Sequence, residues 1–294
     1  MRRIFHFLAL CLAAGFVNAC KKADQVIATE NIPTAGVRFI NAVPDSAGAF
    51  GMDLRFVDMV ESNAQFRITF RGGPATSGAI VTSSQFEFKG ARAGSRHFVI
   101  FLDDTLQAIA STVIKDTTVS LVAGHNYTAL LWGAARGGLG TFKLSFIDET
   151  VADPGTQVAL RVINATGAPI DVSQYVQGGA VPATPTWAAV PAQSISAYVN
   201  VAPGLIMYNV VPAGGGTALF ADVQAMPGAA ASSSAGTSTL DIAPAPGTTV
   251  AGSAVTLIVY PPSTVGARTP QTAAFQKAGG AFVWDRRPPG VPGT

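Results

Sequence analysis

The chain has 294 residues, of which 48% are hydrophobic and 12% charged, and its formal net charge is +2. This length suffices for two domains of ordinary size, and the near-neutral charge without a basic patch argues against nucleic acid as a partner. Its two cysteines, Cys11 and Cys20, exclude a metal site built from cysteine, and no cofactor motif is present.

The first 19 residues have the pattern of an export signal. Arg2 and Arg3 form a positive n-region, and the apolar stretch 4–17 is shorter than the ~20 residues of a membrane-spanning helix. Val17-Asn18-Ala19-Cys20 resembles a bacterial lipobox, in which the cysteine sulfur is diacylated before cleavage on its N-terminal side. We expect a signal peptide over 1–19 and a lipidated Cys20 with a flexible tether over 20–35. The alternative is ordinary cleavage after Ala19, because Val-x-Ala also fits the small-residue rule.

After the tether, the sequence predicts β-strands and turns. Apolar and polar residues alternate strictly at 66–71, 86–89 and 142–146, which is typical of half-buried strands. Denser apolar runs at 97–102, 127–132 and 255–260 suit strands inside a sandwich. Abundant glycine and proline punctuate these runs and disfavour helices. The predicted fold class is therefore all-β, with antiparallel sandwiches.

An internal repeat divides this part of the chain. Arg38-Phe39-Ile40-Asn41-Ala42 recurs as Arg161-Val162-Ile163-Asn164-Ala165, and three further landmarks follow in the same order in both halves. The sequence predicts one sandwich domain at 36–150, a second at 156–287 and a flexible tail at 288–294. The landmarks predict four pairs of equivalent residues: Arg38 and Arg161, Asn41 and Asn164, Asp53 and Asp171, and Asp148 and Asp285.

The motifs of both halves carry a family resemblance. Val37 to Ala42, Pro44-Asp45, Asp53 and the segment 123–128 resemble the bacterial domain-of-unknown-function family 4397. The second copy matches through Leu160 to Ala165, Asp171 and the segment 283–289. The resemblance implies immunoglobulin-like sandwiches, which this family often carries in tandem on exported lipoproteins. It implies no established activity.

The sequence offers few groups for catalysis. Beyond the signal it has two histidines, His97 and His125, which we expect at the surface or rim. The glycine cluster 137–140 precedes a strand instead of a helix, so it predicts a hairpin turn and not a phosphate site. Adjacent Asp103 and Asp104 point to opposite faces of a strand, which suits a turn better than a glycosidase pair.

Two groups of residues need to be weighed as ligand contacts. Asp148, Glu149 and Asp153 are oxygen donors for Ca²⁺ at the domain junction, but a tight-loop spacing is absent, so the prediction is no metal site. Trp187 sits in a proline-rich connection and is the aromatic residue most expected to be exposed to a sugar or peptide. Trp132 and Trp284 lie in predicted strands and should pack in the cores.

Asn41 and Asn164 are predicted to be structural. Each ends an opening strand before a turn, and an asparagine side chain can bond to backbone groups two residues away.

Together these features predict a non-enzymatic lipoprotein of the cell envelope, in the outer membrane, that acts as a surface display or interaction module. One alternative is a carbohydrate- or peptide-binding envelope protein. A more remote one is a hydrolase of surface polymers, which would need a cleft with convergent titratable groups.

Overall fold

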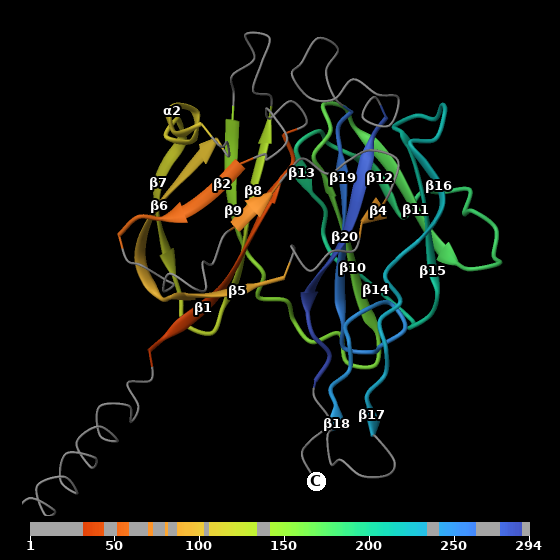
Figure 1. Ribbon diagram of the computed structural model, residues 1–294. Helices are drawn as coiled ribbons and strands as arrows, with labels where there is room; N and C mark the ends of the chain where they lie inside the picture. Colours follow the sequence, from red (N-terminus) through yellow and green to blue (C-terminus); the bar gives the residue numbers. More distant parts are fainter. Residues whose placement is uncertain are drawn as a thin grey trace, which may run out of the picture. The chain divides into compact units, whose positions relative to one another are not determined.

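The computed structural model describes residues 32–43, 52–58, 70–72, 80–81, 87–102, 106–133, 142–233, 241–262 and 277–289. Strands joined by turns dominate these ranges, and the short helix α2 (Gln107–Ala110) lies between two of them (Figure 1). The prediction of an all-β fold built from sandwiches is confirmed. Within the described ranges, no helix has the length and apolar character needed to cross a membrane.

The first half is a sandwich of two four-stranded sheets. Sheet A has the strand order β5-β1-β8-β9, and sheet B has the order β3-β2-β6-β7. The strands of sheet A are β5 (Lys89–Arg92), β1 (Thr34–Asn41), β8 (Asn126–Gly133) and β9 (Phe142–Asp148). Those of sheet B are β3 (Phe70–Gly72), β2 (Met52–Phe56), β6 (Gly94–Leu102) and β7 (Val113–Leu121).

The second half repeats this arrangement. Sheet C has the order β13-β10-β19-β20, with β14 also paired to β10, and sheet D has the order β12-β11-β15-β16. The strands of sheet C are β13 (Ser194–Ile195), β14 (Val199–Val201), β10 (Val158–Asn164), β19 (Ala254–Tyr260) and β20 (Gly279–Arg286). Those of sheet D are β12 (Trp187–Val190), β11 (Ile170–Val176), β15 (Ile206–Pro212) and β16 (Phe220–Gln224).

The two halves share not only strand order but register. β1 pairs in parallel with β8, which places Arg38 opposite Thr128, and β10 pairs in parallel with β19, which places Arg161 opposite Thr256. These two parallel pairs make sheets A and C mixed. Residue alternation could not reveal this, because it fixes the face on which a side chain lies and not the direction of the neighbouring strand.

Three apolar clusters hold the sheets together. One lies between sheets A and B and one between sheets C and D. The third contains Ile40 and Trp132 of the first half together with Ile163 and Tyr260 of the second, so sheets A and C pack on each other. The sheets therefore stack in the order B, A, C, D, and residues 34–294 form one compact unit.

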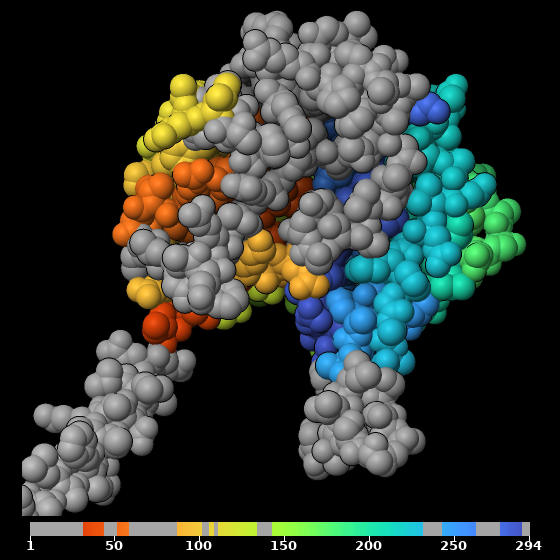
Figure 2. Space-filling view, in the orientation of Figure 1, coloured from red at the N-terminus to blue at the C-terminus, as the bar shows by residue number. Residues whose placement is uncertain are grey.

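Three short strands add to this core. β4 (Ile80–Val81), from the first half, pairs in parallel with β20 at Gly280 and Ala281, so it extends sheet C. Between β16 and β19 the second half inserts the hairpin of β17 (Ser232–Ser233) and β18 (Asp241–Ile242). Figure 2 shows atoms of the second half, coloured green to blue, on the right of the face in view.

The two repeated asparagines end equivalent strands. Asn41 Oδ1 accepts a hydrogen bond from the Val43 amide at 3.0 Å, and Asn164 Oδ1 accepts one from the Thr166 amide at 2.9 Å. Both side chains are buried. The predicted bond to the backbone two residues onward is confirmed. The Asn164 amide group also donates to the carbonyls of Ala168, Val190 and Pro191, so it joins the loop after β10 to the end of β12.

We predict that Asn164→Ala lowers the free energy of unfolding by about 1–3 kcal/mol, because buried backbone groups lose their partners. Urea denaturation of the full chain measures this change. Asn200→Ala, at an exposed position of β14, is the matched control and should change little. If the two variants were equally stable, Asn164 would have no structural role.

Candidate functional site

Ionisable groups meet between the two halves. Alternation along β1 sends Val37 and Phe39 into the first sandwich and turns Arg38 and Ile40 towards the second half. Arg161 has the same place on β10 as Arg38 has on β1. Glu149 follows β9 and Asp285 lies near the end of β20. All four side chains are buried, and their formal charges sum to zero.

The ion pairs cross between the halves in both directions. Arg38 Nη2 lies 2.5 Å from Asp285 Oδ1, and Arg161 Nη2 lies 2.7 Å from Glu149 Oε2. Each guanidinium also lies 3.3 Å from the carboxylate of its own half. Each arginine therefore contacts both acids, and each acid contacts both arginines. We call these four residues the junction cluster.

Threonines satisfy part of the remaining hydrogen-bonding capacity of the junction cluster. Arg38 Nε donates to Thr128 Oγ1 at 2.7 Å, and the Thr128 hydroxyl donates to Glu149 Oε1 at 2.6 Å. In the second half, Arg161 Nε donates to Thr256 Oγ1 at 2.9 Å, and the Thr256 hydroxyl donates to Asp285. The same Arg–Thr–acid chain thus occurs in both halves.

An aromatic ring covers each guanidinium. The Phe88 ring centre lies 4.4 Å from the Arg38 guanidinium, and the Tyr198 ring centre lies 4.6 Å from that of Arg161. Such cation–π contacts are stronger where water is excluded. The two rings differ in one respect, because the Tyr198 hydroxyl donates to Asp285 Oδ2 at 2.8 Å.

The two acids respond differently to this environment. Burial, followed by the charge of Asp285, raises the pKa of Glu149 above its usual value. Burial also opposes ionisation of Asp285, but the charges of Arg161 and Arg38 outweigh it and hold the pKa of Asp285 below its usual value. Asp285 is therefore the acid that the cluster holds most firmly in its charged form.

The sequence-based equivalence of Asp148 and Asp285 is wrong by one residue. Tyr127 pairs with Asp148 in the first half, whereas Val255, the equivalent of Tyr127, pairs with Trp284. The offset lies within the regular ladder, because Thr128 pairs with Ile147 whereas its equivalent Thr256 pairs with Val283. Glu149, and not Asp148, occupies the place of Asp285. Asp148 points outward and lies 2.8 Å from His125.

Among the described residues, the contacts of His125 are not those of a catalytic relay. Asp148 Oδ2 and Thr150 Oγ1 both contact Nδ1 of His125, at 2.8 and 3.1 Å. A nucleophile–base–acid relay needs the hydroxyl and the carboxylate on opposite ring nitrogens. His97 forms a second exposed pair with Asp116. Both histidines lie at the surface, as predicted.

The three acids considered for Ca²⁺ diverge. Glu149 points into the junction cluster, Asp148 contacts His125, and Asp153 pairs with Arg286 at 2.9 Å. Among the described residues, no group of three or more His, Cys, Asp or Glu side chains is placed to hold a metal ion.

The expectation that Trp187 is exposed is wrong. Trp187 is only 7% exposed. Its ring stacks on Tyr208 in the core of the second sandwich, and its Nε1 donates to the Ala197 carbonyl. The surrounding prolines suggested a loop, but Trp187 begins the edge strand β12 and turns inward. It therefore offers little surface to a ligand. Trp132 is buried as predicted, although it packs between the halves, and Trp284 is half-buried against Phe88.

Several predicted features lie outside the described residues. They are the signal and lipobox with Cys20, Asp45, Asp103 and Asp104, and the glycine cluster 137–140.

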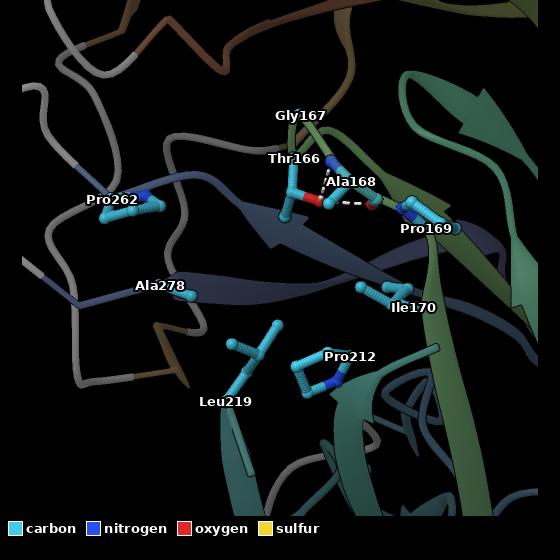
Figure 3. A pocket seen from close by; sticks show the side chains of 9 residues that line it. All are labelled: Thr166, Gly167, Ala168, Pro169, Ile170, Pro212, Leu219, Pro262 and Ala278. Carbon is cyan, nitrogen blue, oxygen red and sulfur yellow. Dashed lines mark hydrogen bonds between the residues drawn. The ribbon is translucent and has the colours of Figure 1, made fainter. Parts of the chain in front are cut away.

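An apolar pocket of about 240 Å³ opens in the second half. Figure 3 shows Pro262 and Ala278 on one side of it and Ile170 and Pro212 on the other, with Leu219 between them. The hydroxyl of Thr166, which also lines it, is bonded to the Ala168 carbonyl and to Asn164. The lining therefore presents apolar surface, and its one side-chain hydroxyl is already engaged.

Hydrogen bonds made by Asn164 and Asp171 hold the wall of the pocket in place. Asn164 fixes the Ala168 carbonyl at 2.8 Å. Asp171 accepts hydrogen bonds from the amides of Ala189 and Gly214 at 2.6 and 3.0 Å, which fixes the chain just after Pro212. The pocket is thus preformed. Sequence reasoning missed it, because its lining comes from five separate segments.

We predict that Asp285→Asn lowers the free energy of unfolding by about 3–5 kcal/mol, because it leaves two buried guanidiniums with one carboxylate. Adding Arg38→Met should cost less than the sum of the two single changes, since it removes the unpaired charge. Urea denaturation of the four proteins in this cycle gives the coupling. Asp148→Asn, which breaks an exposed pair next to Glu149, is the control and should cost about 0–1 kcal/mol. Similar losses for Asp285→Asn and Asp148→Asn would contradict the role of the cluster.

Comparison with known protein families finds a match that covers mainly the first half of the chain. The model of the family described as Domain of unknown function (DUF4397) matches residues 35–173. A search of curated proteins finds no match. The matched range spans the first sandwich and the opening strands of the second, including both arginines of the junction cluster. Residues 35–173 are therefore similar to the DUF4397 family.

Proposed function

We propose that this protein is a non-enzymatic lipoprotein of the cell envelope whose two sandwiches form one rigid display or interaction module. The observation that carries the proposal is the junction cluster. Its arginines and acids neutralise one another between the halves, which suits cohesion of a scaffold. An active site would instead direct such groups into a cleft.

The anchoring part of the proposal rests on the sequence. The lipobox-like Val17-Asn18-Ala19-Cys20 would place a diacylated cysteine fourteen residues before Thr34, where β1 begins. A flexible tether of this length spans roughly 20 Å, enough to hold the module clear of a bilayer surface. Two or more acyl chains give stable attachment. Lys21 after the cysteine favours the outer membrane.

We predict that Cys20 is lipidated. Cells fed labelled palmitate should label the wild-type protein but not Cys20→Ser, and the variant should move to the soluble fraction. Cys11→Ser, within the signal, is the matched control and should leave the label in place. Absence of label from the wild type, with equal release of wild type and Cys20→Ser, would refute the anchor.

We also propose that residues 156–287 are a second copy of the domain at 36–150. Three features support it: the same strand order, the same parallel register at Arg38 and Arg161, and the same Arg–Thr–acid chain. Unrelated sandwiches have no physical reason to share all three.

A second candidate function is the binding of an apolar group in the pocket beside Ile170. Between the two ligand classes considered from the sequence, the pocket favours an apolar peptide side chain over a carbohydrate. Sugars need several hydrogen-bonding partners. The pocket offers prolines and aliphatic side chains, and Trp187 is not available for stacking.

We predict that 1-hexanol, used as an apolar probe, shifts the methyl NMR signals of Ile170 and Leu219, and that glucose does not. Ala168→Phe should abolish the shifts by filling the pocket mouth. Ala180→Phe, at an exposed position away from the pocket lining, is the control and should keep them. Shifts with glucose but not with 1-hexanol would refute an apolar site.

A further inference from the structure

The strands β9 and β20 occupy the same place in the two halves. β9 is the last strand of sheet A, and β20 is the last strand that the second half contributes to sheet C. The pairing of each strand with its neighbour, β8 or β19, aligns Phe146 with Phe282 and Leu144 with Gly280. The two strands can therefore be compared residue by residue.

The outer edges of these two strands are covered differently. β4, from the first half, pairs in parallel with β20 at Gly280 and Ala281. Within the ranges that the structure describes, no strand pairs with the outer edge of β9. Burial follows this difference, because Phe282 is 1% exposed whereas Phe146 is half-buried. An equivalent edge is thus covered by an added strand in one half and more accessible in the other.

The path of the chain explains the difference. β4 lies between β3 and β5 in the first half, and β13 has the same place between β12 and β14 in the second. β4 crosses to the opposite half, whereas β13 pairs with β10 of its own half at Ile163 and Asn164. The counterpart of β4 is therefore used elsewhere and does not cover β9.

The backbone of β9 presents hydrogen-bonding groups at its outer edge. The Glu149 amide donates to the first carbonyl of β8 at 2.7 Å, which fixes the residues whose backbone groups face β8. Because these groups alternate along an antiparallel strand, the amides and carbonyls of Leu144 and Phe146 point away from β8. In β20 the same alternation turns the Trp284 carbonyl outward, where it accepts from Arg38 at 2.6 Å. Outward groups of this kind can bond to an added strand.

The side chains of β9 define what an added strand would contact. Leu144 and Phe146 turn into the first sandwich and pack against its core from the edge. On the other face, Lys143 Nζ lies 4.7 Å from the Trp132 ring centre, and Ser145 Oγ accepts from Trp132 Nε1 at 3.1 Å. A strand that suits this edge therefore has apolar residues at alternate positions and polar residues between them.

We propose that the outer edge of β9 is a strand-addition site, which binds an extended peptide segment of another protein in parallel with β9 and with apolar side chains at alternate positions. The proposal rests on the proposed function as an interaction module and names its surface and class of partner. β4 on β20 is the precedent within this chain for the direction of the added strand. Main-chain hydrogen bonds supply affinity, and the alternating side chains supply selectivity.

A peptide that contains the chain's own added strand tests the site. The probe is residues 77–84, Ser-Gly-Ala-Ile-Val-Thr-Ser-Ser, which include β4. In an NMR titration of the full chain with millimolar peptide, the amide signals of Leu144 and Phe146 should shift and their hydrogen exchange should slow several-fold. Amides of β7, an edge strand of sheet B, are the internal control and should not change. A peptide with proline at both β4 positions lacks two amide donors and should not bind.

Two substitutions at one position separate the backbone of β9 from its side chain. Leu144→Pro removes an outward amide and places a ring at the edge, so it should weaken peptide binding by about tenfold. Since this amide does not face β8, the ladder between β8 and β9 is kept. Leu144→Val retains the amide and is the matched control, which should bind the peptide as the wild type does.

Several results would overturn the proposal. They are the absence of shifts at Leu144 and Phe146, shifts confined to Gly280 and Ala281 of β20, and equal binding of the two peptides. Dimerisation through β9 without peptide binding would overturn it in favour of a second copy of this chain. If Leu144→Pro does not fold, the wild-type titration and the proline peptide decide. Palmitate labelling of Cys20 tests the proposed function independently, so a failed titration leaves that result standing.

Discussion

The reciprocal ion pairs of Arg38 with Asp285 and of Arg161 with Glu149 are the constraint on which this architecture depends. Four buried charges are tolerable only if each has a close partner, and each partner here comes from the other half. Neither sandwich could expose this face without returning its charges to water. The two halves are therefore parts of one unit.

This constraint also explains why the opening strands of the two halves, β1 and β10, are buried on both faces. β1 and β10 are buried along most of their length, because one face packs in its own sandwich and the other packs on the opposite half. Apolar residues two positions after each arginine, Ile40 and Ile163, continue the contact.

Much of the fold could be predicted from the sequence. The apolar runs at 97–102, 127–132 and 255–260 lie in β6, β8 and β19, because dense apolar runs mark buried strands wherever they occur. The repeat of Arg38 and Arg161 was visible, but not the charge cluster, since Glu149 and Asp285 differ in type. The aspartates aligned by sequence, Asp148 and Asp285, are offset by one residue in the strand pairing. The burial of Trp187 and the apolar pocket depend on segments far apart in the chain, which local patterns do not report.

The central claim is that the junction cluster joins the two sandwiches into one cooperative unit. Differential scanning calorimetry of the full chain tests it most directly. One transition should appear, with equal calorimetric and van't Hoff enthalpies. Two separate transitions in the wild-type protein, one for each sandwich, would contradict the account.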